Sequence, residues 1–502
     1  MTEGHGSAGS ARGRPAFYRD GVPSAEQANM VIVSNRGPLS FSVDDRGELQ
    51  AGRGGGGLVS ALGPALAGSG ATWIAGALSA ADRMAAAAGV VEAQGFRLRS
   101  LLVDPDAYRA YYHVVSSGTL WFLHHRLYDT ARRPRFDRRW REAWQAYRDV
   151  NDLYARAVAQ DASEGSVVLV QDYHFSLLPA ELAATRPDLT VVHFHHTPFA
   201  SPDDLRMLPD DVATELLSGL AASAACGFQA PRWAAAFEAC CTELLGRTCP
   251  TFVSPAAVAP GEIEAVASSA PCATALAELE RRVGDRRLIV RVDRIELSKN
   301  LLRGFHAFED LLRSRPEWRE QAVFAAFVYP SREGLADYLA YRQEVEGLVR
   351  RINETWATPG WTPILYDAGD DFPGSVAGLR RYDALLVNPV RDGLNLVAKE
   401  GPLVNERAGV LLLSRESGAW SELGTAALGL NPFDVTATSE ALHTALSMGE
   451  DERRRHAGAV RTLAAARTPH DWLADQLQAA DRATATGASG ADAELLGPTG
   501  RS

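Results

Sequence analysis

Polar side chains in the stretch 387–400, VNPVRDGLNLVAKE, have types and a spacing that suit phosphate and hydroxyl binding. The stretch follows a short apolar run typical of a buried strand, and its second half is typical of a helix start. A strand-to-helix turn leaves free backbone N–H groups that favour a phosphate, and ligands of open α/β sheets bind at this edge. Asp392 would then lie at the mouth of a site, with Glu400 in reach of groups beyond the phosphates, such as ribose hydroxyls. An ordinary loop, in which Asp392 and Asn395 make turn hydrogen bonds, also explains the stretch.

Two cations bracket another predicted strand-to-helix connection. Arg294 and Lys299 follow the apolar run 288–292 and precede a helical segment. This placement suits an anion, because both charges and the helix N-terminus would face the same edge of the sheet. A solvated pair on a surface loop is the competing interpretation.

Two further strands end in groups that can exchange protons or hydrogen bonds. Asp172 follows the apolar run 167–170, and His196 follows the run 191–194. Either alone is typical of a structural hydrogen bond, but at successive strand ends they indicate a site. The neighbouring His195 does not complete a metal pair, since adjacent residues of an extended chain point to opposite sides.

The elements that must position these groups form two successive sets of alternating strands and helices. This pattern predicts an α/β protein with two doubly wound, Rossmann-like domains facing a cleft. The predicted divisions are a disordered tail 1–29, an N-terminal domain 30–268, a C-terminal domain 269–468, a helix at about 469–483 that packs back on the first domain, and a disordered tail 484–502.

Composition excludes several classes of protein. The chain has 502 residues, 46% hydrophobic and 23% charged, and its formal net charge of −11 disfavours a nucleic-acid binder. The five cysteines form neither a metal-ligand spacing nor a disulfide framework. There is no apolar run long enough to span a membrane and no apolar signal core, so we expect a cytoplasmic protein without nucleic-acid or membrane partners. The oligomeric state, a homo-oligomer included, is left open.

Two more features remain ambiguous on their own. The glycine run 54–57 precedes a helix and could let the backbone approach a ligand, although a flexible surface loop is the commoner explanation. Tyr112 and Trp121 flank a short helical segment, where each is either core or a platform for a sugar face.

Taken together and in order, the motifs resemble the trehalose-6-phosphate synthases, a family of retaining glucosyltransferases with the two-domain GT-B fold. The resemblance runs from about residue 31 to about residue 477. It depends on these segments: SNRGP, GGGGL, YYHVVSSGTLW, QDYH, HTPF, GFQ, RVDRIELSKN, PSRE and NPVRDGLNLVAKE.

The resemblance implies roles for the donor-side residues. Arg294 and Lys299 match the pair that binds the diphosphate and steadies the leaving group, and Asp392 and His196 match contacts to hydroxyls of the donor glucose. The remaining donor-side matches are the helix start Asn395, Leu396 and Val397, the ribose-binding Glu400, and Gly56 and Gly57 in the loop that closes over the donor.

On the acceptor side, the resemblance assigns Arg36 and Arg332 to the acceptor phosphate, with a hydroxyl from Tyr112. Trp121 and Asp172 match contacts to the acceptor sugar. The implied reaction transfers glucose from a nucleoside diphosphate to the 1-hydroxyl of glucose 6-phosphate, with retention by front-face attack. No cofactor or metal is expected, because two cations already face the diphosphate.

The sequence departs from the family pattern in two places. Gln171 stands where the family commonly has His, an exchange from which we expect a small effect. Gly369 and Asp370 replace a His-Phe pair found near the base in relatives that use UDP-glucose, and Asp371 follows. A carboxylate matches the two adjacent N–H donors of guanine, so Asp370 and Asp371 favour GDP-glucose over UDP-glucose; a solvated acidic turn is the alternative.

Three other functions fit parts of the pattern. A validoxylamine-type pseudo-glycosyltransferase is disfavoured because the sugar contacts remain. A glucosylglycerol-phosphate synthase is disfavoured by the retained Trp121. An inactive sugar-phosphate sensor would have lost Arg294, Lys299 or Glu400, and all three are present.

Overall fold

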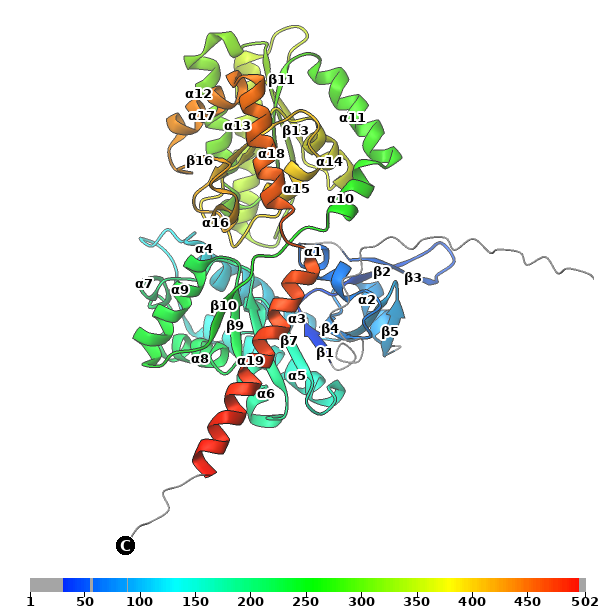
Figure 1. Ribbon diagram of the computed structural model, residues 1–502, viewed down its shortest axis with the longest axis vertical. Helices are drawn as coiled ribbons and strands as arrows, with labels where there is room; N and C mark the ends of the chain where they lie inside the picture. The colour runs from blue at the N-terminus through cyan, green and yellow to red at the C-terminus, as the bar shows by residue number, and fades with distance from the viewer. Residues whose placement is uncertain (1–29, 55–56, 88, 496–502) are drawn as a thin grey trace, which may run out of the picture.

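Two parallel sheets, each flanked by helices, make up the protein in the computed structural model (Figure 1). The structure describes residues 30–54, 57–87 and 89–495. The predicted tail 1–29 lies outside them. Among the described residues, no helix is long and apolar enough to cross a membrane.

The first sheet has eight strands in the order β10-β9-β8-β7-β1-β4-β6-β5. Only β5, at its edge, pairs antiparallel with its neighbour. The strands are β1 Met30–Val33, β4 Thr72–Gly76, β5 Val90–Ala93, β6 Phe96–Leu101, β7 Val167–Gln171, β8 Thr190–His195, β9 Ala225–Phe228 and β10 Thr251–Val253. The hairpin β2 (Leu39–Val43) with β3 (Leu49–Arg53) lies apart from this sheet and was not predicted.

Helices cover both faces of the first sheet. Its strands are apolar on both faces, as a sheet covered on both sides requires: Ile32 of β1 packs in one core cluster, and Val31 and Val33 pack in another. The helical elements are α1 Gly57–Leu66, α2 Ala80–Ala86, α3 Pro105–Tyr108, the π-helix η2 Arg109–Leu120, α4 Trp121–His125, α5 Arg138–Asp161, η3 Tyr173–Phe175, α6 Leu178–Thr185, α7 Pro202–Leu205, α8 Asp210–Leu220, α9 Pro231–Cys240 and η4 Cys241–Leu245.

The second sheet has six parallel strands in the order β13-β12-β11-β14-β15-β16. The strands are β11 Arg287–Arg294, β12 Ala322–Tyr329, β13 Ile364–Asp367, β14 Ala384–Val387, β15 Val410–Ser414 and β16 Leu428–Leu430. Its helices are α10 Pro260–Ala267, α11 Ala270–Val283, η5 Leu297–Lys299, α12 Leu301–Ser314, η6 Pro316–Trp318, α13 Ala336–Trp356, α14 Phe372–Arg381, α15 Val397–Val404, α16 Trp420–Leu423, α17 Val435–Ser447 and α18 Glu450–Ala464.

The chain crosses between the two sheets twice. The first crossing lies between β10 and α10, and α10 packs on α14 and α15 of the second sheet. The predicted boundary at 268 placed residues 260–267 with the first sheet instead. The second crossing lies between α18 and α19 (Pro469–Leu495), which packs on α1 and on strands β7 to β9 of the first sheet (Figure 1).

The last helix is longer than its sequence suggested. The sequence predicts an end near 483 and a disordered tail 484–502, but the backbone of α19 is helical to Leu495; residues 496–502 lie outside the described part of the chain. The segment 484–495 contains four alanines and no proline, and alanine has the highest intrinsic helix propensity. Its mix of Gly, Ser and Thr was the misleading signal.

Candidate functional site

The predicted site residues gather where the carboxyl ends of the two sheets face each other. Asp172 and His196 follow β7 and β8 of the first sheet. Arg294 ends β11, and Arg332 and Asp392 follow β12 and β14 of the second sheet. Contacts across the junction are close: a Cβ added to Gly393 would lie 1.8 Å from the backbone oxygen of His196.

A lysine and two carboxylates form the centre of the donor side. Lys299 Nζ lies 2.5 Å from Asp392 Oδ2 and 3.8 Å from Asp293 Oδ1. Burial alone would lower the pKa of Lys299, but these two carboxylates outweigh it, so its pKa is raised and the amine stays charged. Asn395 also donates to Asp392, at 3.1 Å. The cluster therefore offers one fixed cation at the base of the cleft.

Asn395 carries the strongest local sign of a ligand on this side. Its backbone has φ 83°, a left-handed conformation that asparagine tolerates better than most residues. Its Oδ1 is buried and has no hydrogen-bond partner within the described part of the chain. A buried acceptor without a partner is costly, so a ligand hydroxyl at this atom would be stabilising.

The helix that follows supplies an anion site and a carboxyl group. Leu396 is the N-cap of α15 and Val397 its first residue, and no side chain caps this N-terminus. Its free N–H groups therefore remain for a phosphate. Glu400 lies in the first turn, where burial raises its pKa to about 7.

Arg332 and Trp121 meet across the cleft on the acceptor side. The Arg332 guanidinium lies 3.8 Å from the centre of the Trp121 ring and pairs with the buried carboxylate of Glu296. Trp121 Nε1 donates to the same carboxylate, at 3.3 Å. His125 stacks on Trp121 with 3.8 Å between ring centres, and two groups this close cannot share one ring face. Both faces of Trp121 are covered, so it offers an acceptor only its edge in this conformation.

Tyr112 lies in the π-helix η2, stacked between Tyr108 and His174 at 5.4 and 5.8 Å. Arg36, exposed just after β1, lies near enough to lower the pKa of His174, although burial is the larger cause. Arg294 lies 5.6 Å from the Trp121 ring. The structure thus brings Arg36, Tyr112 and Trp121 to one wall of the cleft, with Arg294 and Arg332 opposite.

Asp172 and His196 are held by the strand ends that they follow. The Asp172 carboxylate accepts the backbone N–H of His196 at 3.2 Å, and burial raises its pKa to about 6. Both ring nitrogens of His196 are already paired, with Gln171 at 2.9 Å and Gln229 at 3.1 Å. Burial lowers the pKa of His196 to about 3, so this ring is neutral.

Of the four remaining predicted donor residues, the structure describes three. Gly56 lies outside the described residues, and Gly57 begins α1. Asp371 is the N-cap of α14, and its carboxylate accepts the N–H of Gly374 at 3.0 Å. Asp370 is exposed, and its charge helps raise the pKa of Tyr329, for which burial is the main cause. Of the two acidic residues, only Asp370 therefore keeps its carboxylate clear of the helix cap.

Sequence reasoning missed two groups that organise the cleft. Glu296 is fully buried and contacts Arg332, Trp121 and the hydroxyl of Tyr338. Gln476 of α19 hydrogen-bonds Gln171, 305 positions away. A carboxylate inside the cationic motif RIELSK was a usable signal for Glu296, whereas nothing local marks Gln476.

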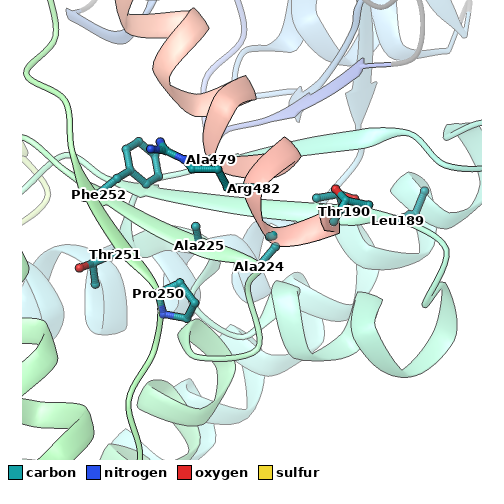
Figure 2. A pocket seen from close by; sticks show the side chains of 11 residues that line it. Leu189, Thr190, Ala224, Ala225, Pro250, Thr251, Phe252, Ala479 and Arg482 are labelled. Atoms are coloured by element: carbon teal, nitrogen blue, oxygen red, sulfur yellow. The ribbon is translucent and has the colours of Figure 1, made fainter. Parts of the chain in front are cut away.

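Two cavities lie away from this cleft. One of about 560 Å³ opens at the amino ends of β8, β9 and β10, where Ala479 and Arg482 of α19 pass over Thr190 and Ala225 (Figure 2). Another, of about 340 Å³, lies between α15 and α18 and includes Tyr382 and Arg461. Neither contains a predicted site residue, because the predicted residues follow the opposite, carboxyl ends of the strands.

Known proteins match the chain over nearly its whole length. The trehalose-6-phosphate synthase of Mycolicibacterium vanbaalenii is 31% identical over 479 residues, covering 90% of this chain and 96% of that protein. An alpha,alpha-trehalose-phosphate synthase (UDP-forming) from Burkholderia xenovorans, solved in complex with glucose-6-phosphate, superposes with a TM-score of 0.79 at 28% identity and covers 90% and 100% of the two chains. An E. coli structure bound with UDP-2-fluoro glucose superposes with a TM-score of 0.78 at 28% identity, covering 89% and 98%.

The two-domain α/β architecture is the predicted GT-B fold, and these structural neighbours confirm that prediction. The model of the family described as "Glycosyltransferase family 20" matches residues 28–482, which include both sheets and the cleft between them. The chain is therefore a glycosyltransferase and belongs to glycosyltransferase family 20.

Proposed function

We propose that this glycosyltransferase is a trehalose-6-phosphate synthase, which transfers glucose with retention from a nucleoside-diphosphate glucose to glucose 6-phosphate. One observation carries the proposal: a fixed cation, an uncapped helix start and an arginine on one wall of the cleft face an aromatic group on the other. Relatives that match along nearly their full length bear the same name, and one structural neighbour is described with glucose-6-phosphate.

On the donor side, Arg294 and Lys299 bind the diphosphate together with the N–H groups that begin α15. Asn395 Oδ1, which is buried without a partner among the described residues, accepts a hydrogen bond from a hydroxyl of the donor. Glu400, one turn into α15, accepts the ribose hydroxyls. Asp392, tied to Lys299, and His196 next to Gly393 border the position of the donor glucose.

On the acceptor side, Arg332 and Arg36 bind the phosphate, assisted by the Tyr112 hydroxyl. Asp172 binds a sugar hydroxyl, and Trp121 contributes its edge. Arg332 is already neutralised by Glu296, so the exposed Arg36, which forms no ion pair with the described residues, supplies the charge.

The chemistry follows from these positions. The bond between the anomeric carbon and the diphosphate oxygen breaks, and its electron pair leaves with the diphosphate. Arg294 and Lys299 stabilise that charge, the largest electrostatic requirement of the step. The 1-hydroxyl of the acceptor attacks from the same face, and its proton passes to the departing phosphate oxygen. The reaction needs neither a carboxylate nucleophile nor, we propose, a metal.

The nucleotide base is a separate question, on which two observations point in opposite directions. Exposed Asp370 favours the adjacent N–H donors of guanine, whereas Asp371 is occupied by capping α14. The Burkholderia neighbours are described as UDP-forming, which favours uracil in those proteins. GDP-glucose remains a proposal that depends on Asp370 alone.

The test supplies glucose 6-phosphate with GDP-glucose or UDP-glucose, with EDTA in parallel, and measures disaccharide phosphate and its anomeric configuration. The proposal expects an α,α-linked product with at least one donor and no loss of rate in EDTA. A product formed only with glycerol 3-phosphate would overturn the acceptor assignment. If Asp370→Ala has the same kcat/KM as the wild type for GDP-glucose and also for UDP-glucose, the proposal that Asp370 recognises guanine is overturned.

A further inference from the structure

His196 is the centre of a continuous chain of hydrogen bonds whose direction is fixed at both ends. The backbone N–H of Ala256 donates to Gln229 Oε1 at 2.8 Å, so the Gln229 amide nitrogen faces His196 Nδ1. At the other end, Gln476 Nε2 donates to the backbone carbonyl of Trp472 at 3.4 Å, which leaves Gln476 Oε1 to face Gln171. A backbone N–H can only donate and a carbonyl can only accept, so neither end can be reversed.

The two ends together leave one arrangement for the histidine. Gln229 donates to His196 Nδ1, so Nδ1 carries no proton. Nε2 therefore holds the proton and donates to Gln171 Oε1 at 2.9 Å, and Gln171 Nε2 donates to Gln476 Oε1 at 3.1 Å. Gln171 and Gln476 are fully buried, and Gln229 is 3% exposed. Protonation of Nδ1 would set two donors against each other in a site that water does not reach.

We propose that Gln171 and Gln476 are positioning residues that hold His196 as the neutral Nε2–H tautomer, and that the last helix is thereby part of the active site. The expected effect on kcat rests on the proposed function, whereas the expected tautomer of His196 does not. Because both ring nitrogens are occupied, His196 meets the donor through its backbone and ring edge. A fixed neutral ring beside the reacting carbon adds no positive charge to compete with Arg294 and Lys299 for the diphosphate.

The ionisable groups around His196 do not supply the charge that would protonate it. Asp172 accepts its backbone N–H and does not reach the ring nitrogens in this arrangement. His193 and His195 precede it on β8, and burial lowers the pKa of both. His174, on the neighbouring η3, is likewise neutral because burial lowers its pKa. On the α19 side, Trp472 packs edge-on to the ring at 5.5 Å and carries no charge.

The first test reads the tautomer directly. Long-range ¹H–¹⁵N spectra of protein with ¹⁵N-labelled histidine should show His196 with a protonated Nε2 and a bare Nδ1 from pH 5 to pH 8. In Gln171→Met, which removes the acceptor at similar length, the Nε2–H signal should lose its hydrogen-bonded chemical shift. In the double variant Gln171→Met/Gln229→Met, which removes both partners of the ring, the single-tautomer signature should be lost. An Nδ1–H tautomer or an imidazolium in the wild type would overturn the proposal, whether or not the protein makes trehalose phosphate.

The second test reads the kinetics. Gln171→Met should lower kcat roughly tenfold with an unchanged KM for glucose 6-phosphate, the size expected for one buried hydrogen bond. Gln171→Glu keeps the acceptor but adds a charge that favours imidazolium, so it should shift the pH profile of kcat relative to the wild type. Gln476→Glu should behave similarly but more weakly. The matched control is Gln478→Glu, on the exposed side of the same helix.

The outcomes separate the two proposals. A wild type without synthase activity, but with the expected tautomer, defeats the proposed function and leaves the hydrogen-bond chain intact. Synthase activity with Gln171→Glu and Gln478→Glu profiles that both superpose on the wild type defeats the positioning role.

Discussion

Lys299 and Asp392 form a 2.5 Å ion pair that joins η5, the short helix after β11, to the turn after β14. The pair links the segment RVDRIELSKN, which the resemblance assigns to the diphosphate, to the segment NPVRDGLNLVAKE, which it assigns to the donor glucose. With Asp293 nearby, it keeps the amine charged despite its burial, so the site holds its cation in place before the leaving group develops charge.

Lys299→Met should lower kcat by about 10²- to 10³-fold, as does loss of one preorganised group that stabilises transition-state charge. Lys299→Arg should retain more activity, because the charge is kept. Steady-state kinetics with a saturating acceptor measure the effect, and circular dichroism checks the fold. An unchanged kcat in Lys299→Met would show that Arg294 alone stabilises the leaving group.

Glu400 should make donor binding depend on pH near neutrality. Burial raises its pKa to about 7 from an ordinary value of 4.5, so the carboxylate ionises in the folded protein only as pH rises through 7. The ionised form is the better acceptor for ribose hydroxyls, so the donor KM should fall between pH 6 and pH 8. Glu400→Gln should flatten this change and raise the donor KM roughly tenfold at pH 8.

The same shift predicts the sign of its effect on stability. Between about pH 4.5 and pH 7, Glu400 keeps a proton in the folded protein that it releases in the unfolded chain. The contribution of Glu400 to the free energy of unfolding therefore falls as the pH rises through this window. Denaturant melts of the wild type and Glu400→Gln at pH 5 and pH 8 measure it. Relative to the wild type, Glu400→Gln should have a higher free energy of unfolding at pH 8 than at pH 5. The opposite change would contradict the raised pKa of Glu400.

Gly393→Ala should disrupt the contact between the two sheets. The added Cβ would lie 1.8 Å from the backbone oxygen of His196, so the turn or the strand end must move. We expect at least a hundredfold loss in kcat/KM, consistent with misplacing reacting groups by about 1 Å. Gly347→Ala is the control: it lies inside α13, and its Cβ would meet nothing within 4 Å among the described residues.

Removing Glu296 should destabilise the protein as well as the acceptor site. Glu296 is 0% exposed and Arg332 6%, so Glu296→Gln leaves a buried guanidinium without its counter-charge, at a cost of about 3–5 kcal/mol. Chemical denaturation measures the change. Glu346→Gln, which breaks the half-exposed pair with Arg342, should cost less than about 1 kcal/mol. Equal losses in the free energy of unfolding for Glu296→Gln and Glu346→Gln would contradict the burial of the Glu296–Arg332 pair.

The alternation of strands and helices was predictable because buried parallel strands are continuous apolar runs, as in Ala384–Val387 and Val167–Gln171. Strand ends then locate polar residues at one edge of each sheet. The structure places Asp172, Arg294 and Asp392, which this reasoning selected, around the cleft.

Contacts between distant segments were not predictable in this way. Glu296 meets Trp121 across 175 positions, and Gln171 meets Gln476 across 305. No local pattern encodes such pairs, because they depend on how the two sheets face each other and on where the last helix returns. The π-helix η2 was also missed in detail, since its residues carry the same apolar periodicity as a regular helix.

The two crossings between the sheets have a mechanical consequence. The chain passes between the halves once before α10 and once before α19, and both passages lie on the side of the cleft where α19 runs down the first sheet (Figure 1). A body tied to another at two points keeps one easy rotation, about the line through those points. An opening of the cleft would therefore be a swing about a single axis, along which the segments that carry Lys299 and His196 would separate.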